Sequence, residues 1–112
     1  MNVLVVGGRD FDDPLVFRRA MAVTMSELSD DTLTLLLAGP KQTNELARHF
    51  INLSEDSFKA RGKSIKFRYV LKDAVDWTEV DMVVSLVNPP QRNTVLGYEA
   101  EGHNVPVNVF RY

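Results

Sequence analysis

The 112-residue sequence contains no cysteine, and this absence removes two kinds of site at once. Without thiols there is neither a disulfide framework nor a thiolate metal centre. The two histidines, His49 and His103, lack the spacing of metal ligands, so we expect no metal site. A chain without cysteine is also compatible with the cytoplasm, and this is the localisation that we predict.

Long apolar runs and an excess of positive charge are missing as well. No apolar run approaches the roughly 18 residues that a membrane helix requires, so we expect no membrane partner. The sequence opens on an apolar strand pattern without the basic segment of a signal peptide. Its net charge is −2, whereas nucleic-acid-binding faces usually carry a basic excess. We therefore do not expect extended nucleic-acid binding, although this net charge does not exclude a local basic pocket.

Short apolar segments alternate along the chain with helix-like segments. The composition is that of an ordinary globular protein, so we predict one domain over residues 1–112. The predicted strands are Asn2–Val6, Thr32–Ala38, Ile65–Val70, Met82–Leu86 and Val105–Phe110. The predicted helices run from about residue 14 to 27, from Gln42 or Thr43 to Arg61, and from Thr94 to Glu101 or His103.

Strands that alternate with helices predict an α/β fold with a parallel sheet covered by helices on both faces. Right-handed crossovers leave few topologies. We predict a Rossmann-like three-layer sandwich with a five-stranded, mainly parallel sheet in the order 3-2-1-4-5. The third strand alternates in polarity and should lie near an edge. Residues 72–80 are ambiguous, and Asp73–Trp77 is a short helix in one interpretation.

Local signals support the helix boundaries. The first helix carries an apolar stripe from Phe17 to Leu28. Asp13 can cap this helix, and Pro14 suits its first turn. Gly62 is a natural residue to end the second helix, and Asn104 can end the third in the left-handed conformation.

A ligand site is expected beyond the carboxyl ends of the strands, where the strand order reverses between the first and the fourth. Three polar turns converge there, namely Gly7–Asp12, Asn88–Thr94 and, beside them, Gly39–Thr43. The candidate ligand-binding residues are Gly7, Gly8, Arg9, Asp10, Phe11, Gly39, Lys41, Thr43, Arg92, Asn93 and Thr94.

The chemistry of these turns favours an anionic ligand. Their glycines allow the backbone to approach a ligand closely. Arg9, Lys41 and Arg92 bring three cations to one end of an acidic protein, and the helix N-termini add their own attraction for anions. Asp10 can accept a hydrogen bond from a ribose or a base. A phosphate-bearing ligand such as a nucleotide fits this set.

Several of these candidate ligand-binding residues can instead have a purely structural role. Arg9 can pair with a neighbouring acid, Thr43 and Thr94 can be plain helix caps, and the phenylalanines can belong to the core. The dinucleotide fingerprint G-x-G-x-x-G, the phosphate-binding P-loop and the Ser/His/Asp arrangement are all absent from the sequence. We therefore predict no cofactor, and no motif supports catalysis.

The opening string Val3-Leu-Val-Val-Gly-Gly-Arg-Asp-Phe11, followed by a helix, resembles the YspA/YpsA-related branch of the SLOG superfamily of small Rossmann-like domains. The wider group includes DprA and the LOG phosphoribohydrolases, which release bases from nucleoside monophosphates. Asp81–Leu86 resembles the strand motif of this family, and the stretch from Asn93 through Pro106 resembles its ending. The resemblance covers most of the chain in order, and it implies a nucleotide pocket and a homodimer formed through helices.

The sequence departs from the family at two of the three turns. The family's second turn usually reads Gly-Gly-Ala-Arg-Gly-Ala-Asp, and only Gly39 matches it securely. The LOG motif Pro-Gly-Gly-x-Gly-Thr-x-x-Glu keeps a proline and Thr94 here, but its glycines are lost and Gly97 stands in place of the glutamate. The resemblance therefore argues against hydrolysis of the LOG type.

Three functions stay open at this stage. The first is a nucleotide-binding domain that senses or sequesters a phosphate-bearing ligand, for example one derived from NAD or ADP-ribose. The second is a protein-binding inhibitor or adaptor on a degenerate fold, for example a phage protein that blocks a partner in the host cytoplasm. The third is an N-glycosidic-bond hydrolase of nucleotides, for which Asp10 and Glu99 are the available carboxylates.

Overall fold

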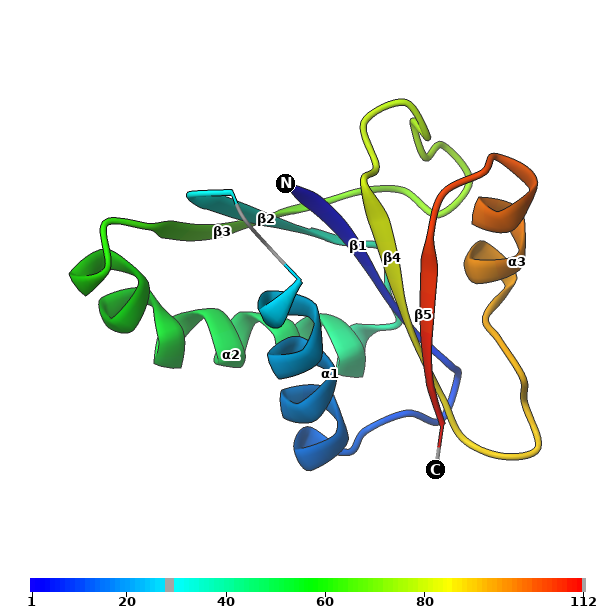
Figure 1. The fold of residues 1–112 in the computed structure, drawn as a ribbon. Coiled ribbons are helices and arrows are strands. Elements are labelled where there is room, and N and C mark those ends of the chain that lie inside the picture. The colour runs from blue at the N-terminus through cyan, green and yellow to red at the C-terminus, as the bar shows by residue number, and fades with distance from the viewer. Residues whose placement is uncertain (28–29, 112) are drawn as a thin grey trace.

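The computed structural model describes residues 1–27 and 30–111 (Figure 1). Leu28, the last member of the predicted first-helix stripe, lies outside the described residues. The elements are β1 (Asn2–Gly7), α1 (Pro14–Ser26), β2 (Thr32–Leu37), α2 (Lys41–Ala60), β3 (Ser64–Tyr69), β4 (Met82–Val87), α3 (Val95–Gly102) and β5 (Val107–Arg111).

The five strands form one parallel sheet in the order β3-β2-β1-β4-β5. This confirms the predicted α/β class, the strand order and the edge position of the third strand. β1 lies at the centre, where Val5 is in register with Leu37 on one side and Val84 on the other. Within the edge strand β3 only Ile65 is buried. The carboxyl ends of β1 and β4 therefore lie side by side.

Helices cover both faces of the sheet, so the fold is a three-layer sandwich. Figure 1 shows α1 and α2 together on one side of the sheet and α3 on the other. The alternation of side chains along β1 matches these layers: Val3 and Val5 belong to the core under α1 and α2, whereas Leu4 and Val6 belong to the core under α3.

Local chemistry sets the helix boundaries. At the start of α1 the Asp13 carboxylate accepts hydrogen bonds from the backbone N–H groups of Leu15 and Val16, at 2.9 and 3.3 Å. α2 begins at Lys41, slightly before the predicted start. Gly62 has a φ of +71° just after α2, and Asn104 has a φ of +60° after α3, so both predicted helix ends are confirmed.

The connection from β3 to β4, residues 70–81, contains turns and no helix. The short helix considered for Asp73–Trp77 does not form. Asp76 instead accepts hydrogen bonds from the hydroxyl and the backbone N–H of Thr78, and such local bonds compete with helix formation. Trp77 is partly buried and packs against the α3-side core. The second face of the sheet is therefore covered by one short helix and an irregular segment.

The last strand starts two residues later than predicted. The backbone N–H of Val105 donates to the carbonyl oxygen of Ala100 at 3.0 Å, which ties this residue to the end of α3 and not to the sheet. Among the helices of residues 1–27 and 30–111, none combines the length and apolarity needed to cross a membrane.

Candidate functional site

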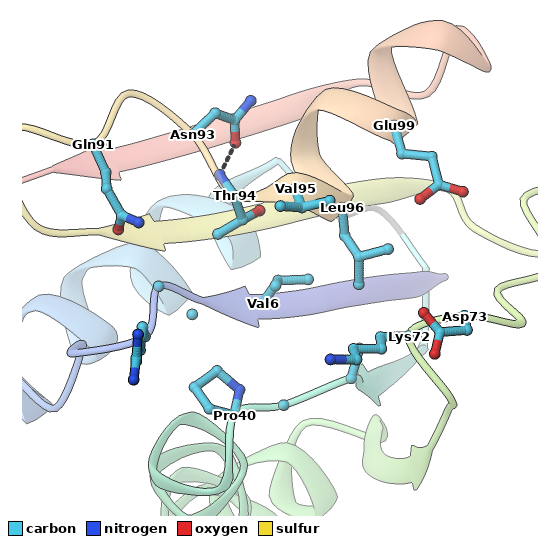
Figure 2. Close-up of a pocket in the computed structure, with 15 residues that line it drawn as sticks. Val6, Pro40, Lys72, Asp73, Gln91, Asn93, Thr94, Val95, Leu96 and Glu99 are labelled. Carbon is cyan, nitrogen blue, oxygen red and sulfur yellow. Dashed lines mark hydrogen bonds between the residues drawn. The ribbon is translucent and has the colours of Figure 1, made fainter.

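A pocket of about 630 Å³ lies at the carboxyl edge of the sheet (Figure 2). This volume lies within the range of about 300–1,000 Å³ that is typical of small-molecule sites. The lining combines glycines, both kinds of charge and apolar side chains. The lining residues are Val6, Gly7, Gly8, Arg9, Ala38, Gly39, Pro40, Lys72, Asp73, Gln91, Asn93, Thr94, Val95, Leu96 and Glu99.

The structure brings together only part of the predicted ligand-binding set. The predicted residues that line the pocket are Gly7, Gly8, Arg9, Gly39, Asn93 and Thr94. They come from the turns after β1, β2 and β4, which are the three turns that the topology was expected to bring together. The pocket therefore lies at the point where the strand order reverses.

The other five predicted residues lie outside the lining. Asp10 is exposed, and its carbonyl oxygen accepts a hydrogen bond from the Asn88 amide at 3.1 Å. Phe11 is only 1% exposed and belongs to the core under α1 and α2. Lys41 and Arg92 are exposed, and Lys41 lies 3.9 Å from Glu45. Thr43 is fully buried.

The turn after β1 is fixed against the loop after β4. The Gly8 N–H donates to the carbonyl oxygen of Leu86 at 2.6 Å. A Cβ on Gly8 would lie 2.7 Å from Gln91 Oε1, so only glycine leaves Gln91 its present place. Arg9 follows directly and lines the same region. We call this part of the pocket, formed by Gly7, Gly8, Arg9 and Gln91, the glycine end.

A buried polar network holds the start of α3 against the pocket. The Ser85 hydroxyl donates to Asn93 Oδ1 at 2.7 Å and lies 2.8 Å from the Thr94 hydroxyl. Thr94 caps α3, because its hydroxyl accepts a hydrogen bond from the Gly97 N–H at 3.0 Å. The first N–H groups of a helix have no partner within it, and Val95 and Leu96, the first two residues of α3, both line the pocket.

Gly97 packs tightly against the side chain of Asn93. A Cβ at this position would overlap the side-chain amide of Asn93, and the Asn93 amide is fixed by Ser85 and Thr94. A glutamate cannot occupy position 97 while Asn93 keeps its place. Glu99, one half-turn later on α3, lines the pocket with its carboxylate.

The α2 side of the pocket is built differently. The Gly7 N–H donates to the Gly39 carbonyl at 3.3 Å, and Pro40 precedes α2 without a side-chain cap. Thr43, in the first turn of α2, packs so closely on Gly7 that a Cβ there would overlap its hydroxyl. The Thr43 hydroxyl has no hydrogen-bond partner among the described residues. Gly7 is thus required for packing, in addition to its place in the pocket lining.

Three charged residues of the lining were not predicted as a set. Lys72 and Asp73 belong to the β3–β4 connection, and Glu99 accepts a hydrogen bond from the Trp77 indole of that connection at 3.3 Å. A signal was present in the sequence, because Lys72 and Asp73 follow a strand whose carboxyl end reaches the same edge of the sheet. We call Asp73 and Glu99 the carboxylate end of the pocket.

The pocket offers recognition groups of both charges and no preassembled metal centre. Within residues 1–27 and 30–111, no group of three or more His, Cys, Asp or Glu side chains could hold a metal ion. No protein-family model, curated protein or solved structure matches the chain. The function is therefore inferred from the chemistry of the pocket itself.

Proposed function

We propose that this protein binds a nucleotide-like, phosphate-bearing small molecule in the pocket at the carboxyl edge of β1 and β4, and senses or sequesters it. One observation carries the proposal: a glycine turn, the Arg9 guanidinium and the first turn of α3 line one pocket of nucleotide size. Backbone N–H groups at a helix N-terminus and an arginine are the groups that proteins use to hold phosphate. We also propose that the chain is a divergent SLOG-type domain.

The remaining lining suits the rest of such a ligand. Val6 and Leu96 supply apolar surface between the polar groups, as in most small-molecule sites. Asp73 and Glu99 supply hydrogen-bond acceptors for hydroxyl or amino groups. The pocket therefore offers a place for the charged, apolar and donor parts of one nucleotide.

Titration calorimetry with a panel of nucleotides tests the proposal. The chain offers a matched pair of variants, because Arg9 lines the pocket whereas Arg92 is exposed on the neighbouring loop and outside the lining. We expect Arg9→Ala to weaken binding at least about tenfold through loss of a charge-assisted hydrogen bond. Arg92→Ala removes the same charge and should change the affinity less than about twofold. Equal effects of the two substitutions, or no binding by any nucleotide, would contradict the proposal.

A second candidate is hydrolysis of the N-glycosidic bond, and the position of Glu99 favours it. Such a reaction needs a carboxylate close to the sugar, where positive charge develops. Glu99 lines the pocket, whereas Asp10 does not. Chromatography of nucleoside phosphates after long incubation tests it: base released by the natural protein and lost in Glu99→Gln supports hydrolysis, and intact nucleotide rejects it.

A further inference from the structure

The pocket has two ends of opposite character. Figure 2 shows Gln91 at one end, with Lys72, Asp73 and Glu99 gathered at the other. Gln91 contacts Gly8, so the glycine end and Arg9 lie away from the carboxylate end. A phosphate held at the glycine end therefore directs the rest of its molecule toward Asp73 and Glu99.

The two carboxylates at the far end are free to receive a ligand. Among the described residues, neither Asp73 nor Glu99 forms an ion pair, because the ion pairs present join other groups. The Trp77 indole occupies one oxygen of Glu99 and keeps the side chain at the pocket. A carboxylate accepts hydrogen bonds and cannot donate them when ionised. Lys72 lines the same end, so two carboxylates face one cation there and the net charge of this end is negative. The far end therefore favours hydroxyl and amino groups and disfavours a second anion.

The first turn of α3 belongs to the proposed phosphate site together with the glycine end, so this helix gives a spacing between that site and Glu99. Val95 is its first residue and Glu99 lies four residues later, which is about 6 Å along the helix axis. This is close to the separation between the 5′-phosphate and the sugar hydroxyls of one nucleotide, and it is shorter than the distance to the far edge of the base. The sugar hydroxyls are thus the donors that meet the carboxylate end.

We propose that Asp73 and Glu99 determine ligand specificity: they accept hydrogen bonds from uncharged sugar hydroxyls and exclude a ligand that carries a second phosphate there. This inference rests on the proposed binding of a nucleotide-like phosphate. It gives the irregular β3–β4 connection a role of its own, because this segment supplies Asp73 directly and holds Glu99 through Trp77.

Calorimetric titration with three probes tests the inference. The probes are adenosine 5′-monophosphate, which keeps both sugar hydroxyls, and the adenosine 2′,5′- and 3′,5′-bisphosphates, which carry a second phosphate on the sugar. We expect the natural protein to bind the monophosphate at least about tenfold more tightly than either bisphosphate. In the double variant Asp73→Asn, Glu99→Gln the preference should fall below about threefold, because like-charge repulsion is removed. Asp12→Asn, which removes a charge from an exposed residue outside the lining, should keep the full preference.

The outcomes distinguish the specificity role of Asp73 and Glu99 from the proposed binding of a nucleotide. Binding of all three probes without a preference, or a preference that survives in the double variant, overturns the specificity role and leaves nucleotide binding standing. A preference that Asp12→Asn abolishes equally overturns it too, because the effect would then reflect overall charge. Failure of all three probes to bind overturns the proposed function and this inference together. All substituted residues are exposed, and circular dichroism checks that each variant keeps its fold.

Discussion

Two helices stand at the walls of the pocket, since α3 lines it and α2 begins directly after the lining residue Pro40. Both pack against a glycine in the same way but with different chemical support. On the α2 side Gly7 presses against Thr43, and on the α3 side Gly97 presses against Asn93. The Asn93 amide is hydrogen-bonded to Ser85 and to the backbone of Thr94, whereas the Thr43 hydroxyl has no partner in the described part of the chain. A close glycine contact alone therefore does not tell whether its neighbour is held by hydrogen bonds or by packing.

This difference extends to the helix starts. Thr94 caps α3 with its hydroxyl, whereas α2 follows Pro40 and has no side-chain cap. The start of α3 is thus held by its own side-chain cap, whereas the first N–H groups of α2 receive no hydrogen bond from a capping side chain. Substitutions at the two helix starts test whether hydrogen bonds support α3 more than α2.

Adding a methyl group at Gly97 should have the largest effect. Gly97→Ala forces Asn93 out of its network, and we expect a loss of about 2–3 kcal/mol in the free energy of unfolding, even though alanine favours a helix. Urea unfolding followed by circular dichroism measures it. Gly102→Ala is the matched control on the same helix, because a Cβ at Gly102 has open space around it. Equal stability of the two variants would show that Asn93 is not fixed.

Replacing the hydroxyl of Thr94 should cost somewhat less. Thr94→Val keeps the shape of the side chain, but it removes the cap of α3 and one contact of Ser85. We expect a loss of about 2 kcal/mol in the free energy of unfolding. The same urea titration measures this loss, and a change below about 0.5 kcal/mol would mean that the α3 network contributes little.

The equivalent change at Thr43 should behave differently. Thr43→Val removes a buried hydroxyl that has no hydrogen bond to lose, so we expect the free energy of unfolding to stay the same or to rise by up to about 1 kcal/mol. Both threonines are buried and both substitutions are isosteric, so the pair isolates the hydrogen bonds. An equal loss in the free energy of unfolding for Thr43→Val and Thr94→Val would show that the two helices are not supported differently.

The smallest effect concerns the β3–β4 connection, the third wall. The Thr78 hydroxyl, followed by the Thr78 backbone N–H, lowers the pKa of Asp76 by hydrogen bonding to its carboxylate. The ionised carboxylate is thus favoured in the folded turn. This interaction stabilises the turn fully above the pKa that Asp76 has in the unfolded chain, and the stabilisation is lost as pH falls through the lower pKa of the folded state. We expect the emission of Trp77, the only tryptophan, to change in this acid range.

A control variant separates this turn from general acid unfolding. Thr78→Val removes the larger cause of the lowered pKa, so its fluorescence transition should move to higher pH. Circular dichroism in the same titration reports on the sheet and helices. Identical transitions in the two proteins would show that Asp76 does not control the position of Trp77.

The sequence predicted the topology well because its buried strands and amphipathic helices have clear periodicity. It predicted three of the four residues of the glycine end for the same reason, since Gly7, Gly8 and Arg9 stand at the end of a strand with a clear apolar pattern. Gln91 was not predicted. Lys41 and Arg92 were predicted from their charge, but the direction of a side chain at a helix start or in a loop depends on the local backbone. The pairing of Gly7 with Thr43 joins residues far apart in the chain, and no local pattern encodes it.

Lys72 and Asp73 were missed for a different physical reason, whereas Glu99 was named as a carboxylate for hydrolysis. Residues 72–80 have neither helical nor strand periodicity, so their position depends on tertiary contacts such as the hydrogen bond between Trp77 and Glu99. Sequence patterns report repeated burial on one face of an element. They carry little information about an irregular segment that is anchored at a few points.

The irregular β3–β4 connection has a consequence for how this protein can change over generations. Its C-terminal end is anchored by the Arg68–Glu79 ion pair of 2.6 Å and by the buried Val80, while Lys72 and Asp73 line the pocket near its start and are exposed. Substitutions at Lys72 and Asp73 change the chemistry of the pocket lining at positions outside every strand pairing. The lining of the pocket can thereby vary from generation to generation nearly independently of the sheet that supports it.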